Sequence, residues 1–228
     1  MFVRRSVGLM VAVLILVLGI SGAAAATTLP PDPSQRFVDV GAGAPYGDAV
    51  EALAEAGIVE GYGDGRFGLM SPVLRQQFTK MVAKTVGLRA NDLFMPFVDV
   101  EIGVGLSESD PTYPWAYVGL CYMYGITKGK DATHFAPYEN VTRQQLVTMA
   151  VRGVQSRLQT PPDDWSGTFP ASDPTHGANI RLAEYNGLLE NVTFGRLHNW
   201  RGLEVPASRG ECAGVLFNVR SLVQDSGN

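Results

Sequence analysis

The sequence predicts an all-α fold of three tandem helix-loop-helix repeats, and three observations support this. The phrase Phe-Val-Asp-Val occurs at residues 37–40 and again at residues 97–100. Each copy leads to a Gly-Ile pair and then to Arg-Gln-Gln, and the interval from Gly57 to Arg75 equals that from Gly125 to Arg143. Apolar residues recur at helical spacing before each Gly-Ile pair and after each arginine. Units of this size bury their apolar faces against neighbours, so we expect one shared core.

Each repeat is expected to hold two helices, the first of which ends at a glycine that can take a left-handed conformation. Repeat 1 spans residues 37–90, repeat 2 spans 91–156 and repeat 3 spans 169–224. The first helices carry Val50, Leu53 and Ala54, then Val118, Cys121 and Tyr122, then Ile180, Ala183 and Glu184. The second helices carry Phe78, Met81 and Val82, then Leu146, Met149 and Ala150, then Cys212, Val215, Leu216 and Val219.

Repeat 3 departs most from the shared pattern. Two extra residues separate Phe169 from Asp173, and residues 191–201 replace the glycine-rich loop that repeat 1 has at residues 61–65. Residues 157–168, which contain Pro161 and Pro162, precede this repeat. Such composition is typical of a linker.

The second helices are expected to begin with capping boxes. Thr142 and Gln145 have the spacing at which the N-cap and the third helical residue satisfy each other's backbone amides, and Ser208 and Glu211 repeat it. Repeat 1 has Leu74 at the cap, with Gln77 at the third position. Because leucine accepts no hydrogen bond, this helix start is predicted to be less stable by about 1 kcal/mol.

Residues 1–26 read as a secretory signal peptide. Arg4 and Arg5 precede an apolar run from Val7 to Ile20, and small residues follow up to Ala26. The run is shorter than the ~20 residues that cross a bilayer, so we expect export and cleavage and no transmembrane anchor in the mature chain. A Pro-rich segment at residues 27–36 then leads to the repeats.

Charge and cysteine content limit the possible partners. The formal net charge is −4, and no basic run occurs, which argues against a nucleic-acid partner. An anionic polymer would require locally placed cations. Cys121 and Cys212 are the two cysteines, and both fall on expected core positions. A small buried hydrophobe explains each, although a disulfide between them stays open.

The ordered set of motifs resembles the S-layer homology repeat. It consists of Phe-x-Asp-Val, an apolar helix ending in Gly-Ile, the loop from Gly61 to Phe67, and a helix start like Thr-Arg-x-Glu. The likeness covers roughly residues 37 to 222. It implies a pseudo-threefold, three-pronged helical bundle, and a noncatalytic domain that binds a secondary cell-wall polysaccharide, often pyruvylated, in the grooves between repeats.

Arg75, Arg143 and Arg209 are the first candidates for the binding site. They stand just inside helix starts, where backbone amides favour anions and a planar guanidinium suits a carboxylate. The resemblance implies that each meets the acidic group of one sugar. A helix-start arginine paired with a protein acid is the alternative interpretation, although the recurrence at one position in three repeats favours the ligand for Arg143 and Arg75.

For the remaining candidates, a structural role explains the residue as well as a role in ligand binding, or better. Asp39, Asp99 and Asp173 suit sugar hydroxyls but equally cap turns. Trp115 stacks on a sugar or fills the core, and repeats 1 and 3 have Gly47 and Gly177 in its place. Gly61 permits a close approach of backbone to ligand, or simply a tight turn. Gln77 and Gln145 lie beside the arginines and complete the predicted set.

Few features of the sequence indicate an enzyme or a metal site. The three histidines are scattered, and neither His-Glu-x-x-His nor Gly-x-Ser-x-Gly occurs. Asp64 lacks the spaced oxygen ligands of a calcium loop. We therefore predict a noncatalytic protein of the cell wall or cell surface without cofactor, anchoring itself or another envelope protein. A protein-interaction module without polysaccharide binding is the first alternative, and a cell-wall hydrolase using an acid pair is the second.

Overall fold

The computed structural model describes residues 36–90, 92–101, 110–169, 172–194 and 202–225. The predicted signal peptide and residues 27–35 of the Pro-rich segment lie outside the described residues. The described part is helical and has no β-strand, which confirms the all-α prediction. No helix in these ranges has the length and apolar character needed to cross a bilayer.

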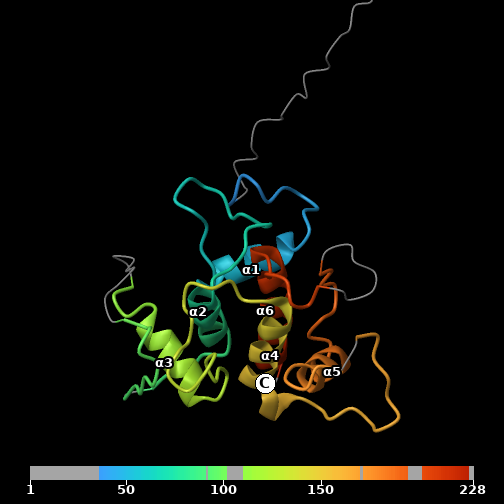
Figure 1. Ribbon diagram of the computed structural model, residues 1–228. Coiled ribbons are helices and arrows are strands. Elements are labelled where there is room, and N and C mark those ends of the chain that lie inside the picture. The colour runs from blue at the N-terminus through green and yellow to red at the C-terminus, as the bar shows by residue number, and fades with distance from the viewer. Residues whose placement is uncertain (1–35, 91, 102–109, 170–171, 195–201, 226–228) are drawn as a thin grey trace, which may run out of the picture. The chain divides into compact units, whose positions relative to one another are not determined.

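Six α-helices and one short 3-10 helix make up this part of the chain (Figure 1). They are α1 (Gly47–Glu55), α2 (Arg75–Thr85), α3 (Trp115–Met123), α4 (Arg143–Gly153), η1 (Gln155–Arg157), α5 (Gly177–Tyr185) and α6 (Arg209–Asp225). Each repeat supplies one helix pair. The first helix of each pair is followed by a glycine with positive φ: Gly57 at 67°, Gly125 at 69° and Gly187 at 73°. The predicted left-handed helix ends are confirmed.

The helices of the three repeats pack against one another in a closed cycle. The second helices, α2, α4 and α6, contact one another in the centre. Each first helix packs mainly on a central helix of a different repeat: α3 on α2, α5 on α4 and α1 on α6 (Figure 1). The apolar face of each repeat is therefore covered by its neighbour, as expected for units that share one core.

A ring of backbone hydrogen bonds closes this cycle at the start of the central helices. The amide of Val73 donates to Ala207 O, that of Ala207 to Val141 O and that of Val141 to Val73 O, at 3.2, 2.9 and 2.8 Å. The degenerate third repeat thus supplies one of three equivalent links. All three residues are fully buried, so these bonds are shielded from water.

The predicted caps are present in repeats 2 and 3. Gln145 N donates to Thr142 Oγ1 at 3.3 Å, and Thr142 N donates to Gln145 Oε1 at 3.2 Å. Ser208 and Glu211 form the same reciprocal pair. In repeat 1 only the Leu74 amide is satisfied, by Gln77 Oε1 at 2.9 Å. The missing half of that cap is as predicted.

Cys121 and Cys212 are both free and both have no exposed surface. Burial raises the pKa of each thiol. The core reading of these residues is confirmed, and no disulfide joins them.

The segment predicted as a linker, residues 157–168, is held against α5. Arg181 Nη2 donates to Pro162 O at 2.8 Å and to Trp165 O at 2.6 Å, while the Trp165 ring meets Tyr185 edge to face at 5.3 Å. The segment has no helix after η1, but these contacts fix the path of the chain.

One turn in repeat 2 carries local strain. Ala136 has φ 60°, whereas repeat 1 has Gly68 with φ 77° at the equivalent position. A left-handed conformation costs a residue with a Cβ about 1 to 2 kcal/mol. We expect Ala136→Gly to raise the free energy of unfolding by about 1 kcal/mol in urea titration. Ala132→Gly, in the same exposed loop, is the control and is expected to gain nothing; an equal or negative change for Ala136→Gly would contradict the prediction.

Candidate functional site

The three candidate arginines are the first residues of the three central helices, and each side chain reaches into the following repeat of the cycle. This happens because the start of each central helix is hydrogen-bonded to the loop of that repeat. Arg75 N donates to Glu139 O, Arg143 N to Val205 O and Arg209 N to Ser71 O, at 2.8, 3.1 and 2.9 Å. Sequence neighbours within one repeat therefore do not form the site. It lies between repeats.

The first two backbone amides at each of these helix starts are not available to an anion, contrary to the expectation from sequence. Besides the first amides, those of Gln76, Gln144 and Gly210 donate to Pro137 O, Leu203 O and Leu69 O. The third amides in repeats 2 and 3 donate to their caps. The cyclic packing uses the donors that an isolated helix would leave open. Anion recognition therefore falls mainly to the side chains, although Leu74 has no side-chain acceptor for the third amide of α2.

Arg75 is buried, with 4% of its surface exposed. Its Nε donates to Phe135 O at 2.9 Å and its Nη1 to Gln145 Oε1 at 3.2 Å. The guanidinium also lies 4.6 Å from the centroid of the Phe135 ring. All these partners are neutral, and no described carboxylate forms an ion pair with Arg75. Burial lowers the pKa of Arg75, and the negative charges of Glu139 and Asp99 offset this lowering only in part.

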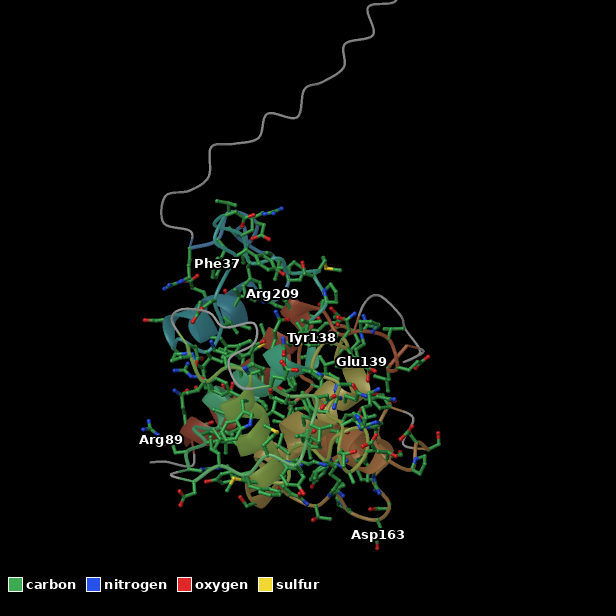
Figure 2. All side chains as sticks on the ribbon, turned by 60° about the vertical axis from the view of Figure 1, so that its left-hand side comes forward. Phe37, Arg89, Tyr138, Glu139, Asp163 and Arg209 are labelled. Carbon is green, nitrogen blue, oxygen red and sulfur yellow. The ribbon has the colours of Figure 1, made fainter. Side chains whose placement is uncertain are left out.

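Arg209 has the same environment but is more accessible. Its Nε donates to Phe67 O at 2.7 Å, and its Nη2 donates to Glu60 O. The guanidinium lies 4.4 Å from the Phe67 ring and 5.0 Å from the ring of Tyr62, which is 45% exposed. Again no described carboxylate pairs with it, and burial lowers its pKa. In Figure 2, Arg209 lies toward the same end of the described part as Phe37, and Asp163 lies at the opposite end.

Arg143 differs from the other two because a protein carboxylate occupies its fork. Its Nη2 and Nε contact Glu211 Oε1 and Oε2 at 2.6 and 3.2 Å, and both side chains are almost fully buried. Its Nη1 donates to Gly202 O at 3.3 Å. Arg143 therefore follows the alternative interpretation, in which a helix-start arginine pairs with an acidic residue of the protein. This result corrects the expectation that the three arginines are equivalent.

The aspartates of the first motif hold loops in place. Asp39 accepts from Phe67 N and Gly68 N, both at 2.7 Å, and Asp99 accepts from Phe135 N and Ala136 N at 2.8 and 2.7 Å. Both carboxylate oxygens are used in each case. These aspartates therefore position the phenylalanine that lies against an arginine.

Asp173 does not repeat this role. Its Oδ1 accepts from Thr175 N and His176 N at 2.8 and 2.7 Å, at the start of α5. These two amide hydrogen bonds lower the pKa of Asp173. The two extra residues before it shift the carboxylate out of register with Asp39 and Asp99, so the expected equivalence is wrong at this position.

The other predicted residues lie close to the arginines but contact protein groups. Trp115 is partly buried and packs on the cluster of Phe97, Val100 and Phe135. A Cβ on Gly61 would meet the Phe37 ring at 2.5 Å, so this glycine permits close packing. Gln145 bonds Arg75 and its own helix cap, while Gln77 is placed by its cap alone.

Sequence reasoning missed a polar cluster between α2 and α3. Lys80 Nζ lies 3.0 Å from Asp110 Oδ2, which also accepts from Tyr117 Oη at 2.9 Å. Burial raises the pKa of Tyr113 and Tyr117 to about 12. Beside them Gln76 Oε1 is buried without a hydrogen-bond partner among the described residues. The only sequence signal for this cluster was the position of Gln76 next to Arg75 in α2.

Comparison with known proteins agrees with the repeat pattern. The S-layer homology domain family matches residues 36–79 and 109–147, in the first two repeats. The chain is 30% identical over 178 residues to an endoglucanase of Bacillus sp. (strain KSM-635), covering 75% of this chain and 18% of that enzyme. It is 27% identical over 177 residues to a cell surface protein of Thermoanaerobacter kivui, covering 75% and 21%. A surface layer protein of Brevibacillus choshinensis is 27% identical over 143 residues, covering 59% and 11%. The chain thus spans less than a quarter of each of these relatives.

Proposed function

The chain belongs to the S-layer homology family, whose domains serve attachment to the cell wall, and from this membership we propose that it binds an acidic secondary cell-wall polysaccharide. The ligand group is a carboxylate, such as that of a pyruvylated amino sugar. The protein acts without catalysis and holds itself or a partner protein at the bacterial surface. Export by the predicted signal peptide would bring it there.

The unpaired guanidinium groups of Arg75 and Arg209 carry this proposal. A buried charge without a counterion is costly, and a carboxylate satisfies it with two charge-assisted hydrogen bonds. Beside Arg209 the exposed ring of Tyr62 suits the apolar face of a sugar, whereas Phe67 and Phe135 are fully buried and hold the guanidinium groups in place. Near Arg75, the unpartnered Gln76 Oε1 adds an acceptor for a sugar hydroxyl or amide.

The same reasoning assigns Arg143 to structure. Glu211 already supplies the carboxylate that a ligand would bring, so the groove between repeats 2 and 3 needs no external anion. The family's binding role is therefore expected at two of the three arginines. Asp39 and Asp99 support these two sites by holding Phe67 and Phe135.

Co-sedimentation with cell-wall sacculi from the source organism tests the proposal. The mature protein is expected to bind intact sacculi and to lose binding after acid extraction removes the secondary polymer. No binding to either preparation would contradict the proposal and favour a protein partner. Clearing of the sacculi would instead indicate a hydrolase.

Arg209→Lys is expected to weaken wall binding about tenfold or more, because lysine keeps the charge but lacks the planar fork. The readout is the bound fraction across a sacculus titration, with thermal melting to verify the fold. Arg157→Lys, at an exposed arginine of η1, is the matched control. Arg143→Lys is expected to leave binding by the folded protein unchanged. Unaltered binding by Arg209→Lys would exclude the arginine mechanism at this groove.

A further inference from the structure

A cavity of about 620 Å³ lies between residues 36–51, the turn at residues 190–191, and α6. Its volume falls in the range of small-molecule sites, which run from about 300 to 1,000 Å³. Arg209 does not line it. The Tyr46 ring, which packs over Gly210 and Gly214 of α6, forms part of its wall.

The cavity exists because small residues replace large ones at equivalent positions of the repeats. Gly47 begins α1 where Trp115 begins α3, and Gly214 stands on α6 where Lys80 stands on α2. Trp115 packs on Phe97 and its neighbours in repeat 2. In repeat 1 the matching Phe37 packs on Phe67 and is largely buried, and it also contributes to the lining of the cavity.

The lining combines aromatic rings, side-chain amides and charged residues, most of which are acidic. Phe37, Tyr46 and Phe217 contribute rings, and Asn191 and Asn218 contribute amides. Three exposed acidic residues, Asp48, Glu51 and Glu190, and one arginine, Arg36, are among the lining residues. Because Arg36 is already paired with Glu51 at 3.0 Å, the charges of Asp48 and Glu190 have no ion-pair partner among the described residues.

We propose that this cavity binds a hexosamine ring whose amine is free. Aromatic faces suit the ring, amides and carboxylates suit its hydroxyls, and the two uncompensated carboxylates favour an ammonium group and disfavour an acid. The site is distinct from the arginine grooves and prefers the opposite charge. It therefore adds a second class of glycan to the acidic polymer, and it does not depend on the wall-binding proposal.

The proposal is tested by titrating the mature protein with glucosamine, N-acetylglucosamine and glucuronate. Binding is monitored through the chemical shifts of backbone amides in NMR spectra. Glucosamine is expected to bind with a Kd of about 1 mM, as suits a ligand of its size, and glucuronate at least about tenfold more weakly. Shifts should concentrate at residues 41–51 and 214–218. No shift with glucosamine, or tighter binding of glucuronate, would overturn the proposal.

Gly47→Trp is the variant that closes the site, with Gly47→Ala as its matched control. A Cβ on Gly47 would lie 3.7 Å from Val40 Cγ1, an ordinary contact, so neither substitution creates a clash at the Cβ. The tryptophan is expected to raise the melting temperature and to abolish glucosamine binding, while the alanine retains it. If a folded Gly47→Trp protein still binds glucosamine, the proposal that the sugar binds in this cavity is overturned.

A variant with fewer acidic charges provides an independent test if Gly47→Trp impairs folding. Asp48→Asn with Glu190→Gln should weaken glucosamine binding about two- to tenfold and leave N-acetylglucosamine binding nearly unchanged. Wall co-sedimentation of this variant should match the parent. An equal loss for both sugars would refute the ammonium preference.

Discussion

Glu211→Gln is expected to lower the free energy of unfolding by about 3 to 5 kcal/mol. The reason is that the Arg143 guanidinium, 9% exposed, would remain in the core without its carboxylate. The amide can still accept at the Ser208 cap, so the loss reports the ion pair between repeats 2 and 3. Urea unfolding followed by circular dichroism measures it.

Two variants control this result. Glu204→Gln removes the same charge at an exposed site and is expected to change stability by less than about 0.5 kcal/mol. The double variant Arg143→Met with Glu211→Leu removes both charges and should recover most of the loss, because apolar residues can replace a buried pair. If Glu211→Gln is as stable as Glu204→Gln, the pair does not join the repeats.

The repeated motifs predicted the fold well because each motif has a local physical role. The glycines after the first helices allow the left-handed turn, and the threonine or serine caps satisfy amides at the start of the second helices. Both effects depend on residues only a few positions apart. The exchange of helices between repeats depends on contacts far apart in sequence, and no local pattern encodes which neighbour covers which helix.

For this reason the candidate site was only partly predictable. The sequence identified the three arginines, but their equivalence was wrong because Arg143 meets Glu211 across a repeat boundary. A signal existed: the third residue of the helix is Gln77, Gln145 or Glu211, and only the last is charged. Using this signal required the knowledge that Arg75 and Arg143 each face the third helical residue of the next repeat. The cavity at Gly47 was invisible for the same reason, since α6 closes its far side.

Gln145→Glu is expected to close the groove at Arg75 in the way that Glu211 closes the groove at Arg143. Gln145 Oε1 already accepts from Arg75 Nη1 at 3.2 Å and from Thr142 N, so a carboxylate there can keep the cap and pair with the guanidinium. A charged acceptor in place of the amide should stabilise the protein by about 1 to 3 kcal/mol. It should also compete with the polymer's carboxylate. Wall binding should then rest on Arg209 alone and fall about tenfold or more, because two linked sites give avidity that one site lacks.

The two effects have opposite signs, and this makes the test of Gln145→Glu specific. A variant that merely damages the protein would lose both stability and binding, whereas a closed groove gains stability as it loses binding. Gln155→Glu in η1 adds the same charge at an exposed position and controls for general repulsion from an acidic polymer. Sacculus titration and urea unfolding of both variants supply the two measurements. If Gln145→Glu is more stable but binds the wall as tightly as Gln155→Glu, then the Arg75 groove does not hold the polymer, and Arg209 is the arginine to which the binding proposal must be confined.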